Sequence, residues 1–168
     1  ETLNFIGSDS DRRHRVLGHI AGASGGAIER LKIRFKSASK NSYTGLVPFA
    51  YDSVYLVALG IVANGSNPLT GPNLANSLTR LLAPAEVQLE SSLDTISTAY
   101  QVLLGGSNFD LNGVSGPLDF NPTTGDAESD VQIWCADVDA NGAAKGYLNS
   151  GLYYSAAARS LQGKMECP

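Results

Sequence analysis

The stretch "NGVSGPLDFNPTTGD", residues Asn112 to Asp126, decides how the fold is interpreted, because it is either a catalytic loop or a structural turn. It holds three glycines, two prolines and a serine between small residues. A hydrolase nucleophile on such a turn needs the pattern G-x-S-x-G, followed at once by a helix. Pro117 stands where the second glycine belongs, and a strand-like segment follows it. The pattern therefore argues against catalysis at Ser115.

The same residues form a coherent strand and turn. Gly113 and Gly116 give the backbone the freedom that a sharp change of direction needs. Leu118 and Phe120 are two residues apart and share one strand face, which we expect to point into a core. Pro122 and Gly125 are typical turn residues, so the segment from Asn121 to Asp126 is predicted to be a turn.

Composition narrows the class of protein. The chain has 168 residues, of which 43% are hydrophobic and 17% charged, as expected for a globular α/β domain. The formal net charge of −4 provides no basic surface for nucleic acid. The longest apolar run, Val54 to Ala63, is too short for a membrane span. No targeting segment opens the chain, so it is predicted to be a fragment or a processed exported protein.

Periodicity predicts helices and strands alternating over the first two-thirds of the chain, and mostly strand and turn after that. The change from alternating helices and strands to mostly strand and turn falls near Asn112. We expect strands at Thr2–Ile6 and Ala85–Leu89, a short helix between Asp11 and Leu17, and helices beginning near Ala27, Pro48, Thr70 and Leu93. The helix from Pro48 to Ala63 is apolar nearly all round, so it has to be covered on several sides.

Chemical motifs are few. "DVDANG", Asp137 to Gly142, matches half of a calcium loop, but Leu148 stands where the twelfth-position Glu belongs, and a hairpin turn explains the same residues. His14 and His19 are five residues apart, which suits no helical metal pair. The glycines of "AGASGGAIE" fit neither nucleotide-binding pattern. No cofactor or metal is predicted, and catalytic residues are not assigned.

The two cysteines, Cys135 and Cys167, leave two alternatives open. They form a disulfide that ties the chain end to a strand, which requires an oxidising compartment, or they are unrelated thiols.

Three stretches resemble the C-terminal portion of the type I periplasmic binding proteins, the family of leucine/isoleucine/valine-binding proteins and extracellular ligand-binding receptors. "FIGSD", Phe5 to Asp9, resembles the family's strand that ends at the cleft. "FAYDSVYLVALGI", Phe49 to Ile61, is similar to its Tyr-Asp-Ala helix, with Ser53 in place of Ala. The opening stretch, followed by "VQIWCADVDANG", resembles its crossover, strand and hairpin.

The resemblance implies a two-lobed α/β fold whose N-terminal half is absent. Residues 1–22 would belong to the second lobe, 23–112 to the first, and 113–168 to the second again, in a β-rich tail. The hinge glycines would be Gly22, Gly25, Gly113 and Gly116. Without the missing half, the helices between 27 and 104 would leave a large apolar face exposed.

The resemblance also implies a ligand site in a cleft between the lobes. Asp9, with Ser8 beside it, would hold the α-ammonium of an amino acid, although Asp9 could equally cap the helix that follows. Leu46, Phe49 and Tyr51 would supply an apolar wall, or simply pack in a core.

The function implied is that of a non-catalytic solute-binding protein in the periplasm or outside the cell. It would serve an ABC-type transporter, and its partners would be the membrane subunits together with the missing N-terminal portion or a second copy. Two alternatives remain open: a ligand-sensing receptor domain of the same fold, and a small serine hydrolase using Ser115.

Overall fold

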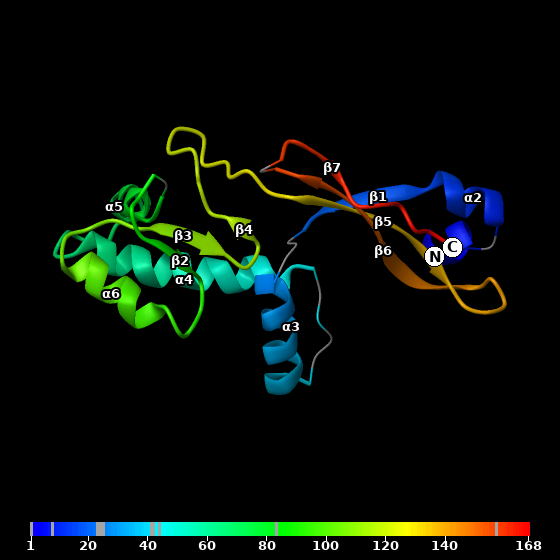
Figure 1. Ribbon diagram of the computed structural model, residues 1–168, viewed down its shortest axis with the longest axis horizontal. Helices are drawn as coiled ribbons and strands as arrows, with labels where there is room; N and C mark the ends of the chain where they lie inside the picture. The colour runs from blue at the N-terminus through cyan, green and yellow to red at the C-terminus, as the bar shows by residue number, and fades with distance from the viewer. Residues whose placement is uncertain are drawn as a thin grey trace. The chain divides into compact units, whose positions relative to one another are not determined.

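The chain forms a mixed α/β structure with two sheets, which divides into two compact units. The computed structural model describes residues 2–7, 9–22, 26–40, 43, 45–82, 84–156 and 158–168. Unit 1 joins the two ends of the chain, Glu1–Ala23 and Ser129–Pro168. Unit 2 is the continuous segment Ser24–Glu128. Each unit has its own sheet, and the chain passes from one unit to the other twice (Figure 1).

Unit 1 is built on an antiparallel sheet in the order β1-β5-β6-β7. Its strands are β1 (Leu17–Ala21), β5 (Val131–Val138), β6 (Ala144–Ser155) and β7 (Ser160–Gln162). Two short helices, α1 (Thr2–Gly7) and α2 (Ser10–Arg15), pack against it. Trp134 lies over Gly18 on the neighbouring strand, where a Cβ would come within 1.9 Å of its ring. This glycine is therefore required by close packing.

The predicted strand at Thr2–Ile6 is wrong, because this segment is helix α1. Alternation over five residues cannot separate a strand from a single helical turn with one buried side chain. Ile6 is the buried residue, at 4% exposure, and the helix contacts β5 and β6. The Arg12 guanidinium lies over the Phe5 ring at 4.0 Å, which ties α2 to α1. Strand β1 was also missed, since Leu17–Ala21 was divided between a predicted helix and a loop.

Unit 2 contains most of the helices. They are α3 (Gly26–Ala38), α4 (Val47–Asn64), α5 (Gly71–Ser77), the 3₁₀ turn η1 (Leu78–Leu81) and α6 (Ile96–Leu104). The predictions for α3, α4, α5 and α6 are confirmed. The small sheet has the order β2-β3-β4, with β2 (Gln88–Glu90) parallel to β3 (Asp110–Gly113) and β4 (Gly116–Pro117) antiparallel to it. Buried side chains from α4, η1, α6 and β3 meet in one core, centred on Leu59, Leu81, Leu103, Phe109 and Leu111.

The structure places the second passage between units later than the sequence predicted. The turn from Gly113 to Gly116 joins β3 to β4 inside unit 2, and the boundary lies between Glu128 and Ser129. Leu118 is buried and Phe120 packs on the same core, as the strand pattern predicted. Asn121–Asp126 is a turn in which the Asn121 side chain accepts the backbone N–H of Thr123. Gly113 and Gly116 are therefore turn residues and not a passage between units.

Helix α4 is apolar on two opposite faces. Tyr55, Leu59 and Ala63 are buried in the core, whereas Val54, Val57 and Ile61 are 67%, 51% and 44% exposed. Among the described residues, α4 is the one helix that is long and apolar enough to cross a membrane, a test that the core helices of soluble proteins also pass. Its packing against α5 and α6 identifies it as a core helix whose second face lies open in this chain.

The side chain of Arg80 joins the ends of two helices. Its guanidinium donates to the carbonyl of Ala63 near the end of α4 at 3.1 Å, and to that of Leu103 in α6 at 3.1 Å. Further bonds reach the Ser107 carbonyl at 2.7 Å and the Asn108 side chain at 3.2 Å. A cation at these carbonyls also complements the negative ends of both helix dipoles. Arg80 therefore holds α4, α6 and the loop after α6 in one arrangement.

We expect Arg80→Met to lower the free energy of unfolding of unit 2 by about 2 kcal/mol, because charge-assisted hydrogen bonds are lost while the apolar stem is kept. Urea unfolding followed by circular dichroism measures the change. Lys36→Met, at an exposed position in the last turn of α3, is the matched control and should change stability by less than about 0.5 kcal/mol. Equal effects of the two substitutions would contradict the role given to Arg80.

Candidate functional site

A buried carboxylate organises the turn that opened the sequence analysis. Asp52 in α4 is 1% exposed, and donors from two other segments surround it. Its Oδ1 accepts the Ser91 hydroxyl at 2.5 Å and the Val114 backbone N–H at 3.0 Å. Its Oδ2 accepts the backbone N–H and the hydroxyl of Ser115, at 2.7 and 2.5 Å. These bonds tie α4 to the end of β2 and to the β3–β4 turn.

Ser115 is thus part of a structural cluster. It is 6% exposed, and its hydroxyl donates to a carboxylate that is itself buried. A nucleophile has to reach its substrate, so this burial disfavours catalysis at Ser115. His14 and His19 belong to unit 1, whereas Ser115 belongs to unit 2.

The two glycines of the turn fit the cluster for different reasons. A Cβ on Gly113 would lie 2.3 Å from Oδ2 of Asp52, so only glycine allows the carboxylate to approach the backbone this closely. Gly116 has a φ of +128°, a conformation that L-residues rarely adopt. Both positions were predicted as hinge glycines, and both are instead required by the geometry of a fixed turn.

Of the other two predicted hinge glycines, Gly22 lies at the end of β1 and Gly25 lies outside the described residues. The Gly22 backbone N–H donates to the Asp130 carbonyl at 3.0 Å. A Cβ on Gly22 would come within 2.3 Å of the Gln132 side chain. Gly22 is therefore held by the sheet of unit 1, directly before the chain leaves that unit.

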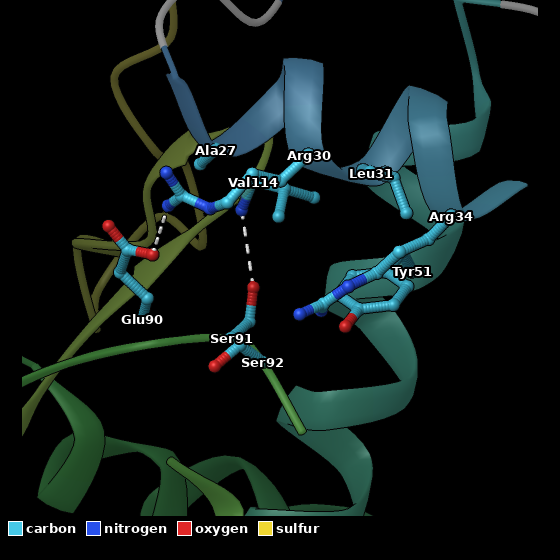
Figure 2. Close-up of a pocket in the computed structure, with 9 residues that line it drawn as sticks. All are labelled: Ala27, Arg30, Leu31, Arg34, Tyr51, Glu90, Ser91, Ser92 and Val114. Atoms are coloured by element: carbon cyan, nitrogen blue, oxygen red, sulfur yellow. Dashed lines mark hydrogen bonds and ion pairs between the residues drawn. The ribbon is translucent and has the colours of Figure 1, made fainter. Parts of the chain in front are cut away.

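A polar hollow lies beside the Asp52 cluster. Figure 2 shows its lining, which comes from α3, α4, the end of β2 and the β3–β4 turn: Ala27, Arg30, Leu31, Arg34, Tyr51, Glu90, Ser91, Ser92 and Val114. Arg30 pairs with Glu90 at 2.5 Å, and Arg34 pairs with Asp94 at 3.3 Å. Because these four side chains are 45% to 83% exposed, each pair contributes little to stability. Each arginine of the hollow is thus paired with an acid, of which Glu90 lines the hollow and Asp94 does not.

Tyr51, predicted as apolar wall, lines this hollow and also packs on the core. Its hydroxyl donates to the Tyr55 hydroxyl at 3.1 Å, and the two ring centroids are 5.0 Å apart. Burial is the main cause that raises the pKa of Tyr55, and the hydrogen bond from Tyr51 adds to it. Tyr55 therefore stays protonated over the physiological range, and its ring packs against that of Tyr51.

The other two predicted wall residues flank the start of α4. Leu46 precedes the helix and is 67% exposed, while Phe49 is half-buried in its first turn. The helix begins with Pro48 in its first turn, where the missing N–H costs no hydrogen bond. Leu46 is thus free of core packing, as a ligand wall requires, whereas Tyr51 is engaged in it.

Asp9, the predicted ammonium ligand, is in unit 1 and caps helix α2. Its Oδ1 accepts the backbone N–H of Arg12 at 2.9 Å, with extended backbone angles typical of an N-cap. This hydrogen bond is the main cause that lowers the pKa of Asp9. Asp9 is exposed, so its carboxylate meets solvent while it caps. Ser8, predicted beside it, lies outside the described residues.

The half calcium motif is a hairpin turn. The Asp139 side chain accepts the backbone N–H of Asn141 at 2.8 Å and that of Ala143 at 3.0 Å, and Gly142 has a φ of +79°. Asp137 instead faces Lys145 across the hairpin at 3.3 Å. Among the described residues, no group of three or more His, Cys, Asp or Glu side chains is placed to hold a metal ion.

The structure joins Cys135 to Cys167 in a disulfide, with a Cα–Cα distance of 6.2 Å that suits such a bond. Cys135 is in β5 and is 1% exposed. The bond connects the second-last residue of the chain to the central part of the unit 1 sheet.

Asp110 is a second buried acidic residue of unit 2. The sequence analysis did not identify it, because no pattern in the sequence indicates that it is buried. Asp110 lies in β3 and is 7% exposed. The side chain of Asn112 hydrogen-bonds to its carboxyl group. Burial is the main cause that raises its pKa, and the nearby charge of Asp119 adds to the effect.

In comparisons with known proteins, no family model, no curated protein and no solved structure matches this chain.

The Asp52 cluster predicts a coupled response to two substitutions. Gly113→Ala forces a methyl group into the carboxylate, and Asp52→Ala leaves buried donors unsatisfied; each should lower the free energy of unfolding by about 2 to 4 kcal/mol. Asp52→Ala also removes the atoms that the new methyl would strike. The double variant should therefore lose at least about 1 kcal/mol less than the sum. Urea unfolding of all four proteins measures this.

Gly71→Ala is the matched control, since a Cβ there meets nothing within 4 Å. Its effect on the free energy of unfolding should add to that of Asp52→Ala. Additive losses for Gly113 and Asp52 would show that their close approach does not exist in solution.

Asp110 predicts a pH-dependent stability. Because its folded-state pKa is raised, the folded chain holds the proton to a higher pH than the unfolded chain. The resulting stabilisation is complete below the unfolded pKa and is lost as the pH rises through the folded value. Asp110→Asn stays neutral, so it should be more stable than the unmodified chain at pH 7, with a difference that shrinks towards pH 4. Unfolding experiments across this range measure the difference, and a difference that does not change with pH would contradict the role given to Asp110.

Proposed function

We propose that this chain is part of a non-catalytic solute-binding protein of the type I periplasmic kind, which captures a small polar ligand for an ABC-type transporter. The observation that carries the proposal is the path of the chain. Unit 1 is assembled from both ends of the sequence, and unit 2 is a continuous segment between them. The resemblance implies two passages between lobes in this part of the family's sequence, and the chain passes between its two units twice, with the second passage after Glu128 rather than near Asn112.

An exported location agrees with the covalent chemistry. A disulfide that links Cys135 to Cys167 persists in an oxidising compartment such as the periplasm or the extracellular space. The proposal therefore places the protein outside the cytoplasm, where a solute-binding protein meets its ligand.

The open face of α4 supports a further partner. Val54, Val57 and Ile61 form an apolar stripe opposite the buried face of the helix. Exposed apolar stripes of this kind are usually covered in the working protein. We propose that this surface contacts the N-terminal portion that the resemblance implies, or a second copy.

An amino acid or a related compound is the ligand class that we propose, with Asp9 as the residue that binds its ammonium group. Three features support this role: Asp9 is exposed, its capping bond fixes it in place, and its pKa is lowered, so it is ionised at neutral pH. An ionised carboxylate forms charge-assisted hydrogen bonds with an ammonium group. Among the predicted wall residues, Leu46 before α4 is the exposed one.

The experiment is isothermal titration of the full-length protein with a panel of amino acids, repeated with Asp9→Asn. Asparagine caps a helix as well as aspartate does, so this variant keeps the fold of α2 and removes only the charge. We expect affinity for the ligand to fall roughly tenfold to a hundredfold.

Asp11→Asn is the control, because Asp11 is an exposed acid in the first turn of the same helix. It should leave affinity within about twofold. If no amino acid binds, the proposed ligand class is wrong. If one binds and Asp9→Asn leaves the affinity unchanged, the ligand class stands and the role of Asp9 is wrong.

A further inference from the structure

The end of the chain forms a strap across the sheet of unit 1. After β7, residues 163–168 continue along β6 in the direction of β7 and then reach β5, a path that the terminal segment follows in Figure 1. The Glu166 backbone N–H donates to the Ser150 carbonyl on β6 at 2.7 Å, and Cys167 bonds to Cys135 on β5. We call residues 163–168 the C-terminal strap.

The strap lies close to the backbone of β6. A Cβ on Gly163 would come within 2.1 Å of the Gly151 carbonyl oxygen, and Gly163 has a φ of +79°. A glycine at this position therefore allows the chain to turn tightly as it leaves β7. Every residue of the strap except Cys167 is nevertheless exposed, so the strap buries little of itself.

Two of the positions that the strap contacts are fully buried. Cys135 is 1% exposed and Ser150 is 0% exposed. Leu17 and Leu148, the residues paired with Cys135 on its two neighbouring strands, are 43% and 38% exposed. Directly opposed residues of antiparallel strands lie on the same face of a sheet. The strap thus covers one part of a face whose remainder is open to solvent.

We propose that the disulfide is a redox-controlled latch, and that its reduction releases the C-terminal strap while the sheet of unit 1 stays folded. The pairing of β5 with β1 and β6 involves no residue of the strap. Only the position of the C-terminal strap along β6 and β5 depends on the Cys135–Cys167 disulfide. Release exposes Cys135, which lies between Leu17 and Leu148, two apolar residues that are already 43% and 38% exposed.

The chemistry is a two-step exchange with a dithiol. One thiolate of the reductant attacks the sulfur of Cys167, the less buried of the pair, which breaks the protein disulfide and frees Cys135 as the leaving thiolate. The second thiol of the reductant then attacks the mixed disulfide and frees Cys167. The reductant leaves as a disulfide, and the protein gains two electrons and two protons.

Hydrogen exchange measured by mass spectrometry tests this on the whole chain, with and without dithiothreitol. We expect exchange in residues 163–168 to become at least about tenfold faster on reduction, while exchange in β5 and β1 stays unchanged. Unchanged protection of the strap would overturn the proposal, because the strap would then hold without the bond. Faster exchange throughout β5 would overturn it as well, because the bond would then hold the sheet.

Cys167→Ser provides a reductant-free version of the same test. This variant should show the fast exchange of the released strap from the outset and should not respond to dithiothreitol. Met165→Ala, an exposed strap position with the disulfide intact, is the control and should retain both the protection and the response. Slow exchange of the strap in Cys167→Ser would also overturn the proposal.

Discussion

Unit 2 depends on a single buried carboxylate more than on any other polar group. Asp52 on α4 accepts four hydrogen bonds from three residues that belong to two other segments. Hydrogen bonds to a carboxylate are stronger than those between neutral groups. A buried charge is costly unless donors satisfy it, and here two backbone N–H groups and two hydroxyls do so. The β3–β4 turn and the end of β2 are therefore fixed relative to α4, and β2, β3 and β4 form a sheet although none is longer than four residues.

This constraint explains why the two faces of α4 differ. One face carries Asp52 and the side chains that meet α6 and β3, and it is closed by polar bonds as well as by packing. The opposite face has Val54, Val57 and Ile61 in the open and no charged residue among them. A helix that is apolar all round suits a position between two layers. Unit 2 supplies one of these layers, which is the physical reason for assigning the other to a partner.

The sequence predicted α4 because its apolar run from Pro48 to Ala63 is long. It did not distinguish the buried Leu59 from the exposed Val54 and Ile61, because the helix is apolar nearly all round. It failed at Thr2–Gly7, where a single turn has too few residues for any period to emerge. It also misjudged the glycines at 113 and 116. Gly116 needs its backbone freedom, as its φ of +128° shows, but Gly113 is required by Asp52, which lies 61 residues earlier (113 − 52), and a separation of this size leaves no local pattern. The same holds for Arg80, whose partners are carbonyls on other elements.

The capping role of Asp9 and its proposed ligand-binding role would support each other. From the sequence alone the two roles are alternatives, since either explains an acid before a helix. Under the proposed function, the capping bond prepares the carboxylate for binding. The hydrogen bond from Arg12 to Oδ1 fixes the side chain and lowers its pKa, so the carboxylate is charged and oriented before a ligand arrives. An uncapped aspartate would lose conformational freedom on binding, whereas this one has already lost it when α2 folds.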